Sequence, residues 1–454
     1  MTSVELFDVH KIIDVYVVGE SETCMATFTN WILACQNVNM TGQRSAGKTF
    51  ITSNVAKLLP DVNGLYNLSS GSDKSHWYQA EALNKHSHVM IPELNKLPKQ
   101  ALEILKDWGE YRASDYSVTI FEAGNRRVHK YKMPPKPFIF CLADEEELEI
   151  DEQLRSRLTI IRVDISEDQN IAVNYNQAQL AMLPNNPKID NMNNFDEVKS
   201  HIANMPPWDV ESFRHPAATE FVNSIPTTFT NCRRDFPKYL RNTFGITRFY
   251  HNDRISKDIN ILDSNNKLVT KKIFMVTPAD MFYNHLIYGN ILIESSLRCN
   301  AVERTIIKIL KETGQPVSRD VIQAKIRLKG MNISAQMITR HLKELRNLGY
   351  VKNVEVKKNT MAVYTVGELF KDFNFEVNWK EIIDICKTNI KKYYPEIADE
   401  YIKRFCEDPV VIHPYVGTEI KLLELNYEPK ELEIESKGDE EDSNELFLED
   451  EFID

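Results

Sequence analysis

The sequence predicts a layered α/β core, followed by a helical region and a small module of three helices and a β-hairpin. Two patterns carry this prediction. Short apolar runs of strand type alternate with helical patterns between residues 37 and 165, which is the order of a layered α/β fold. Helical periodicity returns three times between residues 297 and 366, and two short strand-like runs follow the third helix.

The length and composition fit a modular globular protein. At 454 residues the chain is too long for one hydrophobic core, and about three domains are expected. No run approaches the roughly 20 apolar residues of a membrane span, and the N-terminus lacks the pattern of a signal peptide. We therefore expect no membrane partner and a cytoplasmic location, with a nucleoid or a viral replication site as alternatives. Seven scattered cysteines without a C-x-x-C pair are expected to be reduced core thiols.

Charge is distributed unevenly along the chain. The net charge is −11, and the segment from Glu428 to Asp454 alone holds thirteen carboxylates against two lysines. The segment from Arg298 to Lys358 holds fourteen basic residues against five acidic ones, which is typical of a nucleic-acid-binding surface. The acidic tail is expected to be disordered and to dock a basic protein partner, or to compete with DNA for the basic segment.

The core begins after a short N-terminal segment, whose apolar run from Ile12 to Val18 reads as a strand. A second apolar run ends near Met40, and a helical run from Phe50 to Leu59 ends at Pro60. Between these runs lies a sequence that fits the pattern G-x-x-x-x-G-K-[ST]: Gly42, Gln43, Arg44, Ser45, Ala46, Gly47, Lys48 and Thr49.

This pattern between a strand and a helix predicts a phosphate-binding loop. Its glycines let successive backbone N–H groups face the phosphates, and the helix N-terminus adds positive potential. Lys48 would reach the outer phosphates, and Thr49 would ligate Mg²⁺. We therefore predict ATP and Mg²⁺ as cofactors, bound by residues 42–49 and the adjoining Phe50. The alternative is a glycine-rich turn without a ligand.

A second apolar strand, from His88 to Ile91, is followed by Pro92 and Glu93. A carboxylate at the end of such a strand is where an ATPase holds the residue that activates water, so Glu93 is the candidate base. Pro92 occupies the position at which an Asp would help to hold the metal ion. Mg²⁺ would then rest on Thr49, phosphate and water, and slow hydrolysis is expected. The alternative for Glu93 is a glutamate that caps a helix after a structural strand.

The segment from Ser117 to Lys136 reads as two strands around a Gly-Asn turn, a hairpin signal. Its tip and return strand carry cations that could contact a phosphate backbone: Arg126, Arg127, Lys130 and Lys132. A solvated hairpin without a ligand is the alternative. The next strand ends at Asp144, and the run from Gln153 to Leu158, with Arg155 and Arg157, leads into the last core strand.

The three helices of the C-terminal module and the strands after them predict a winged helix-turn-helix. The third helix, from Ser334 to Arg346, places Met337, Ile338, His341, Leu342 and Leu345 on one face. We read His341 as a packed core residue. The outward residues of this helix and the turn between the strands would contact DNA: Gln336, Arg340, Lys343, Lys357 and Lys358. A module that docks another protein is the alternative.

This order of parts resembles AAA+ P-loop ATPases, and within them the minichromosome-maintenance (MCM) replicative helicases of archaea and mobile elements. Gly42 to Thr49 corresponds to Walker A, and Val89 to Glu93 to Walker B. The Leu154 to Leu158 segment is similar to the family's arginine-finger segment, with Arg157 as the first candidate and Arg155 as the second. Asp144 stands at the sensor-1 position, and the basic hairpin resembles the pore hairpin. The chain departs from the family in Pro92, in Asp144, and in having no large oligonucleotide-binding domain before residue 37.

The resemblance implies an ATP-driven DNA translocase or replicative helicase that acts as a homo-oligomeric ring, with a hexamer expected. It places Glu93, Arg157, Arg155 and Asp144 in catalysis. The alternative is an ATP-switched DNA-binding initiator or transcription regulator with weak hydrolysis.

The expected fold is thus an α/β P-loop ATPase core of AAA+ type with a helical lid region and a C-terminal winged helix-turn-helix. Its expected divisions are 1–36 (short N-terminal segment), 37–165 (ATPase core), 166–296 (linker and lid), 297–366 (winged helix), 367–426 (small helical region) and 427–454 (acidic tail).

Overall fold

The structure is a computed structural model. It describes residues 4–68, 77, 79–122, 125–143, 151–164, 167–182, 194–224, 232–262, 267–296, 299, 301–328, 333–354, 362–367 and 377–425. Three groups of predictions lie outside these residues: the role of Asp144, the turn contacts of Lys357 and Lys358, and the acidic tail. The side chain of Arg127 also lies outside what is described.

A parallel sheet forms the centre of the predicted core. Its strands are β1 (Val38–Gly42), β2 (Leu65–Asn67), β3 (His88–Ile91), β6 (Phe138–Ala143) and β7 (Thr159–Arg162), in the spatial order β2-β3-β6-β1-β7. All four pairings in this sheet are parallel. Every residue of β1 is buried, because helices cover both faces of a sheet of this kind. The predicted α/β core is therefore confirmed, and its sheet is parallel.

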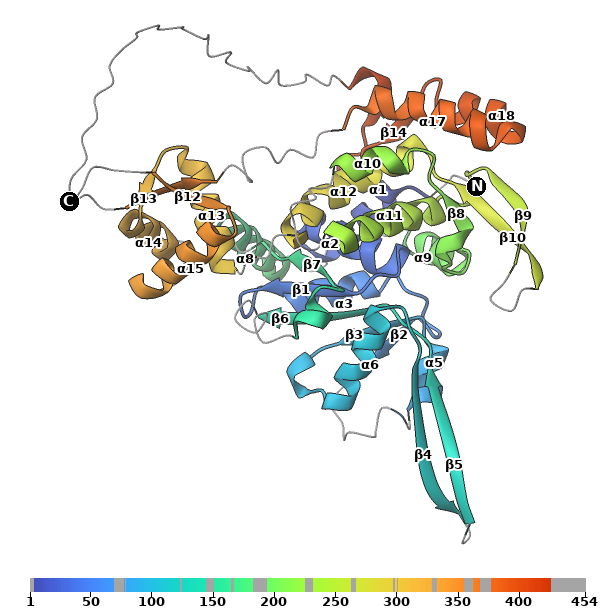
Figure 1. Ribbon diagram of the computed structural model, residues 1–454, viewed down its shortest axis with the longest axis horizontal. Coiled ribbons are helices and arrows are strands. Elements are labelled where there is room, and N and C mark those ends of the chain that lie inside the picture. Colours follow the sequence, from blue (N-terminus) through green and yellow to red (C-terminus); the bar gives the residue numbers. More distant parts are fainter. Residues whose placement is uncertain are drawn as a thin grey trace, which may run out of the picture.

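Helices connect these strands, since parallel neighbours need a crossover. The connections contain α3 (Lys48–Ala56), α5 (Ala80–Lys85), η2 (Leu94–Lys96), α6 (Lys99–Gly109) and α7 (Glu152–Arg155). In this order β6 lies between β1 and β3 (Figure 1). Because all three strands run in the same direction, the loop after β1 and the residues after β3 lie at the same edge of the sheet.

The N-terminal segment is helical, so the strand read at Ile12 to Val18 is wrong. It contains α1 (Leu6–Tyr16), α2 (Ser21–Thr27) and a π-helix, η1 (Phe28–Leu33). Leu6, Val9, Ile12 and Ile13 are buried on one side of α1, because their spacing matches a helical face better than a strand. These residues share one apolar core with the P-loop strand and with later helices.

The region after the sheet is mainly helical, as predicted, but it also carries a β-hairpin that sequence patterns did not reveal. The helices are α8 (Glu167–Met182), α9 (Phe195–Ala203), α10 (Ala218–Ser224), α11 (Cys232–Phe249) and α12 (Pro278–Ser296). The strands are β8 (Phe213–Arg214), β9 (Ser256–Leu262) and β10 (Leu268–Met275), with a short 3-10 turn, η5 (Val210–Ser212), before them. Buried polar contacts tie α11 to α12, including Asn242 to Asn284 at 2.8 Å.

The chain returns to this body after the C-terminal module. The returning part contains α17 (Trp379–Tyr393), α18 (Pro395–Phe405), β14 (Val410–Ile412), β15 (Glu419–Lys421) and η6 (Leu422–Glu424). The Tyr401 hydroxyl donates to the Val276 carbonyl at 2.7 Å, and the rings of Trp379 and Phe282 meet edge to face. Residues 377–425 therefore complete the core that the N-terminal helices begin (Figure 1).

The C-terminal module has its own apolar core. It contains α13 (Ala301–Thr313), β11 (Val317–Ser318), α14 (Arg319–Leu328), α15 (Ala335–Asn347), β12 (Val351–Val354) and β13 (Val363–Val366). Its strands form a small antiparallel sheet in the order β11-β13-β12. This is the predicted order of three helices and a wing.

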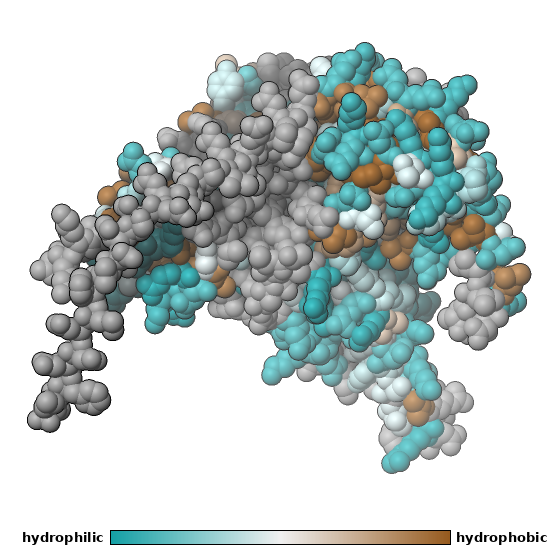
Figure 2. Space-filling view, turned by 45° about the horizontal axis from the view of Figure 1, so that its top comes forward, coloured by the Kyte–Doolittle hydropathy of each residue, from teal (hydrophilic) through white to brown (hydrophobic). Residues whose placement is uncertain are grey.

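A long hairpin, β4 (Ser114–Glu122) and β5 (Asn125–Met133), projects from the body on the side of β3 and α6 (Figure 1). Hydrophilic residues dominate most of the coloured surface in Figure 2, with hydrophobic ones scattered among them. Among the described helices, none has the length and apolar character needed to cross a membrane.

Candidate nucleotide-binding site and nucleic-acid surfaces

The loop after β1 adopts a backbone that suits phosphate binding. Gly47 has a φ of +83° and directly precedes α3, and its carbonyl accepts the first helical hydrogen bond, from Ile51 N at 2.9 Å. Ser45 also has a positive φ, of +66°, a conformation that non-glycine residues seldom adopt. Gln43, Arg44, Ser45 and Thr49 are exposed, so the loop presents its backbone to solvent at a helix N-terminus.

Lys48 lies over this loop. Its ammonium donates to the carbonyl oxygens of Gly42 at 2.9 Å and of Gln43 at 2.5 Å. Neutral carbonyls are weaker partners for an ammonium than phosphate oxygens are. Phosphates at the loop would therefore draw this ammonium toward themselves. Phe50, the next predicted site residue, is 58% exposed.

Cys141 lies directly beneath the loop and was not among the predicted site residues. It belongs to β6, in register with Met40 of β1. Its thiol is 3.4 Å from the Thr52 hydroxyl and also interacts with Thr49. Burial raises the pKa of this thiol, so it remains protonated at neutral pH. Only the strand order, which sequence patterns do not fix, could have placed Cys141 here.

Glu93 lies at the same edge of the sheet as the loop. Ile91 of β3 is in register with Phe140, and Phe140 with Asn39, which lies three residues before Gly42. The Glu93 carboxylate is exposed and is paired with the Lys96 ammonium at 2.5 Å. Although Glu93 immediately precedes η2, its side chain makes no capping hydrogen bond there. The helix-capping alternative therefore gains no support.

Arg157 is held by its own chain. Its guanidinium donates to the Lys106 carbonyl at 2.9 Å and pairs with Glu110 at the end of α6. Only 12% of this side chain is exposed. The contact with α6 is tight, because a Cβ on Gly109 would lie 2.9 Å from Arg157 Cδ. Arg155, the last residue of α7, is half-buried, and Arg234 donates to the neighbouring Ser156 hydroxyl.

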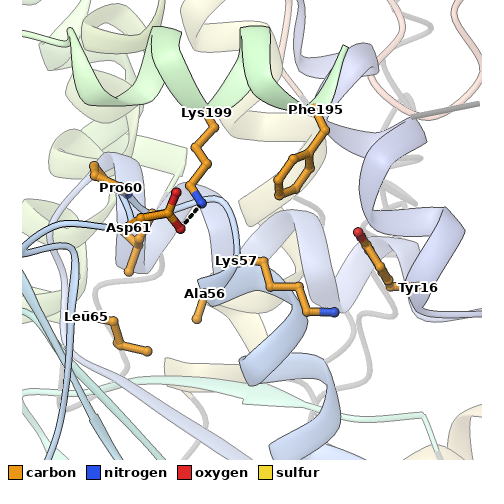
Figure 3. A pocket seen from close by; sticks show the side chains of 9 residues that line it. Tyr16, Ala56, Lys57, Pro60, Asp61, Leu65, Phe195 and Lys199 are labelled. Atoms are coloured by element: carbon orange, nitrogen blue, oxygen red, sulfur yellow. Dashed lines mark hydrogen bonds and ion pairs between the residues drawn. The ribbon is translucent and has the colours of Figure 1, made fainter. Parts of the chain in front are cut away.

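Two cavities lie beside the N-terminal helices, and neither is lined by residues of the loop. One of about 640 Å³ lies where β7 ends, near His10, Glu20, Asp164 and Tyr415. Burial raises the pKa of Glu20 to about 7. The other, of about 440 Å³, lies at the end of α3 away from the loop. There Lys57 reaches over the Tyr16 ring at 3.9 Å, and Lys199 pairs with Asp61 (Figure 3).

Three of the four predicted cations of the hairpin lie on one face of β5. Arg126, Lys130 and Lys132 are all exposed, and their even spacing along a strand places them on the same side. They stand opposite Phe121, Ser117 and Asp115 of β4. At the base of the hairpin, Tyr116 stacks on Trp77 with ring centroids 4.8 Å apart. The structure therefore anchors the hairpin on aromatic packing and leaves its cationic face in solvent.

The third helix of the module, α15, presents Gln336, Arg340 and Lys343 to solvent and buries Ile338, His341, Leu342 and Leu345. The prediction for Met337 is wrong, because this side chain is 52% exposed. The Ser334 hydroxyl accepts from Met337 N and fixes the first turn ahead of the packed residues. Arg340 forms a surface ion pair with Glu344 at 3.1 Å.

Residues 304–362 match the family model of the ribonuclease R winged-helix domain. No curated protein matches the chain in sequence. A candidate ATPase from Cytophaga hutchinsonii ATCC 33406 is 13% identical over 62% of this chain and 83% of its own, with a TM-score of 0.35. A variant of Thermotoga maritima RuvB is 13% identical, with coverages of 79% and 95% and a TM-score of 0.26. NtrX from Brucella abortus, in complex with ATP, is 11% identical, with coverages of 52% and 64% and a TM-score of 0.25.

These structural similarities are too weak to carry an argument, and none of these three structures is an MCM helicase. The fold rests on the strand order and on the family-model match. A winged-helix domain lies C-terminal to a parallel-sheet α/β core that carries a phosphate-loop sequence.

Proposed function

We propose that the protein is an ATP-driven DNA translocase of helicase type, in which the loop at residues 42–49 binds Mg²⁺-ATP. One observation carries the proposal. The loop backbone, the Lys48 ammonium and the Glu93 carboxylate all lie at one edge of the parallel sheet, beside the helix that begins at Lys48. That is where ligands bind in folds of this kind.

The residues present fit a triphosphate better than they fit a tightly held metal ion. The exposed loop and the N-terminus of α3 favour phosphate oxygens, and the Lys48 ammonium can move onto them from two carbonyl groups. Thr49 would hold Mg²⁺, which supplies charge neutralisation between the outer phosphates when it is bound. Because Pro92 offers no carboxylate, this chain holds the ion through fewer groups, and hydrolysis is expected to be slow.

Glu93 is the group that would orient and deprotonate water at this edge. Its pair with Lys96 directs the carboxylate toward η2. The pair is exposed on both sides, with 58% of Glu93 and 61% of Lys96 accessible, so breaking it costs little. A modest rotation of Glu93 would therefore free the base.

DNA would be held at two places. The cationic face of the hairpin offers Arg126, Lys130 and Lys132 to a phosphate backbone. The exposed side of α15 offers Gln336, Arg340 and Lys343 to a duplex. A motor requires a nucleotide site and a DNA contact that can move with that site. In this proposal the projecting hairpin is the DNA contact.

A ring, with a hexamer as the expected size, would place ATP at subunit interfaces, with an arginine supplied by the neighbour. Arg157 could serve only after leaving Glu110 and the Lys106 carbonyl, whereas Arg155 ends α7 and is half-buried. These contacts count against Arg157, the first candidate that the resemblance implied, and Arg155 is the second candidate to be tested beside it.

The second candidate function is an ATP-switched DNA-binding regulator. Two observations favour it: Pro92 after β3 and the internal partners of Arg157. Both features would lower turnover while leaving nucleotide binding intact. In such a protein, ATP controls assembly on DNA, and hydrolysis only resets the state.

Steady-state ATPase rates with and without single-stranded DNA separate the two functions. A motor predicts a rate that rises several-fold and saturates with DNA. A rate that stays slow at every DNA concentration, together with DNA binding that depends on ATP, would favour the regulator. Absence of ATP binding would remove both.

A further inference from the structure

The winged-helix module contains three side chains from two helices that together have the composition of a divalent-cation site. Glu303 lies on α13, and His341 and Glu344 lie one turn apart on α15. One ligand atom of each residue lies within 4.8 Å of the other two. We propose that these residues bind Zn²⁺ and thereby fasten the third helix of the module to the first.

The first argument is the geometry around one nitrogen. His341 Nδ1 lies 3.0 Å from Glu303 Oε1 and 3.7 Å from Glu344 Oε2. This nitrogen carries one proton or one lone pair, so it can satisfy only one of the two carboxylates. Zn²⁺ with ligands at about 2.1 Å in a tetrahedron would separate neighbouring ligand atoms by about 3.4 Å. The two measured separations lie on either side of that value.

The second argument is that two carboxylates meet where the cluster is largely buried. Glu303 is 4% exposed and His341 is 8% exposed, and a second carboxylate approaches them from Glu344. Two carboxylates at this distance repel each other, and burial strengthens the repulsion. Arg340 pairs with Glu344 from the solvent side. A cation between the three ligand atoms would lie against both carboxylates at once, whereas the printed contact of Arg340 is with Glu344.

The donor set indicates which cation fits. One imidazole nitrogen and two carboxylate oxygens suit Zn²⁺, whereas Mg²⁺ and Ca²⁺ prefer sites made of oxygen alone. Three protein ligands leave a fourth position for water. Glu344 is the partly exposed member of the cluster, so the ion would enter from its side of α15.

Binding here would couple a metal ion to the DNA-contacting surface without touching the nucleotide loop. Arg340 and Lys343 are exposed neighbours of His341 on the same helix. Joining α15 to α13 would reduce the motion of these two side chains relative to the rest of the module. The site is therefore distinct in place and chemistry from the Mg²⁺ expected at Thr49.

The test is a Zn²⁺ titration of the full chain after chelator treatment, without nucleotide and with millimolar Mg²⁺ present. Calorimetry reports affinity, and Co²⁺ absorption reports ligand geometry. Three proteins are compared: wild type, Glu344→Gln, and Arg340→Gln. The last breaks the same Arg340–Glu344 ion pair but keeps all three ligands, so it is the matched control.

We expect one equivalent of Zn²⁺ to bind to the wild type and to Arg340→Gln. In Glu344→Gln this site should weaken by about tenfold or more, while the circular dichroism of the metal-free protein stays unchanged. Zn²⁺ held elsewhere on the chain would persist equally in all three proteins. Equal binding by wild type and Glu344→Gln, or no saturable binding in the presence of Mg²⁺, would overturn the proposal.

Discussion

The loop at residues 42–49 and the third helix of the winged-helix module are both proposed to bind phosphate, but they are built differently. The loop relies on backbone: Gly47 and Ser45 have positive φ, and a helix begins where the loop ends. The exposed side of α15 relies on flexible side chains, such as Arg340 and Lys343, that stand on a packed helix. We therefore expect the loop to select its ligand by shape. The exposed side of α15 should bind mainly through charge, so its affinity should depend on salt concentration.

Changing the loop should have the largest effect. Lys48→Ala removes the ammonium that donates to the Gly42 and Gln43 carbonyls and would serve the phosphates, so it should lower ATP turnover by about a thousandfold or more. Lys48 is half-exposed, so the fold should persist. Steady-state phosphate release checks the rate, and circular dichroism checks the fold. Turnover at the wild-type level in a folded variant would place the active site elsewhere.

Changing the base should have the next largest effect. Glu93→Gln keeps the shape of the side chain but removes its proton-accepting charge, so turnover should fall by about 10²- to 10⁴-fold. ATP binding, measured with a slowly hydrolysed analogue, should be retained. Lys96→Gln is the matched control, because it breaks the same Glu93–Lys96 pair and leaves the base in place. Normal hydrolysis by Glu93→Gln would show that another group activates water.

Arg157 should act mainly on stability. Removing it leaves the Glu110 carboxylate and the Lys106 carbonyl without this partner, although Glu110 keeps its pair with Arg112, and should cost about 1 to 2 kcal/mol of unfolding free energy. Arg155→Ala is the comparison variant, and it should lower hydrolysis if Arg155 is the arginine that acts on a neighbouring nucleotide. Urea unfolding and ATPase rates of the two variants check this. A stable Arg157→Ala protein with lost hydrolysis would restore Arg157 as the arginine that acts on a neighbouring subunit.

The side-chain surface should give the smallest effect and the clearest dependence on salt. Arg340→Ala combined with Lys343→Ala should weaken duplex binding by about tenfold at moderate salt. It should also reduce the slope of log affinity against log salt by about 1.8, because each lost phosphate contact removes about 0.9. Fluorescence anisotropy at several salt concentrations measures both quantities. An unchanged slope would favour a module that docks protein.

The features that could be predicted from the sequence are those set by residues close together in the chain. The loop from Gly42 to Thr49 and the buried face of α15 are set by neighbours in the chain, so motif and periodicity located them. The run from Ile12 to Val18 misled, because its branched apolar residues resemble a strand while the wider spacing from Leu6 onward forms a helix face. Met337 also misled, because the capped first turn of α15 leaves it half-exposed.

Other features depend on contacts between residues far apart in the chain. Glu110 lies 47 positions before its partner Arg157, and Glu303 lies 38 positions before His341. Residues 377–425 follow the winged-helix module in the chain but pack on α12 of the main body. No local pattern encodes these pairings, so the sequence singled out Arg157 and His341 but not their partners.

The central claim is that DNA on the projecting hairpin drives ATP hydrolysis at the loop. The most direct measurement is the ATPase rate against single-stranded DNA concentration for three proteins. The first is the wild type, and the second is the hairpin variant Lys130→Ala with Lys132→Ala. The third is a control, Lys391→Ala with Lys392→Ala, which makes the same charge change at two exposed lysines of α17. We predict that DNA raises the rate of the wild type and of the control, and that the hairpin variant loses most of this increase. An equal increase in all three proteins would contradict the account.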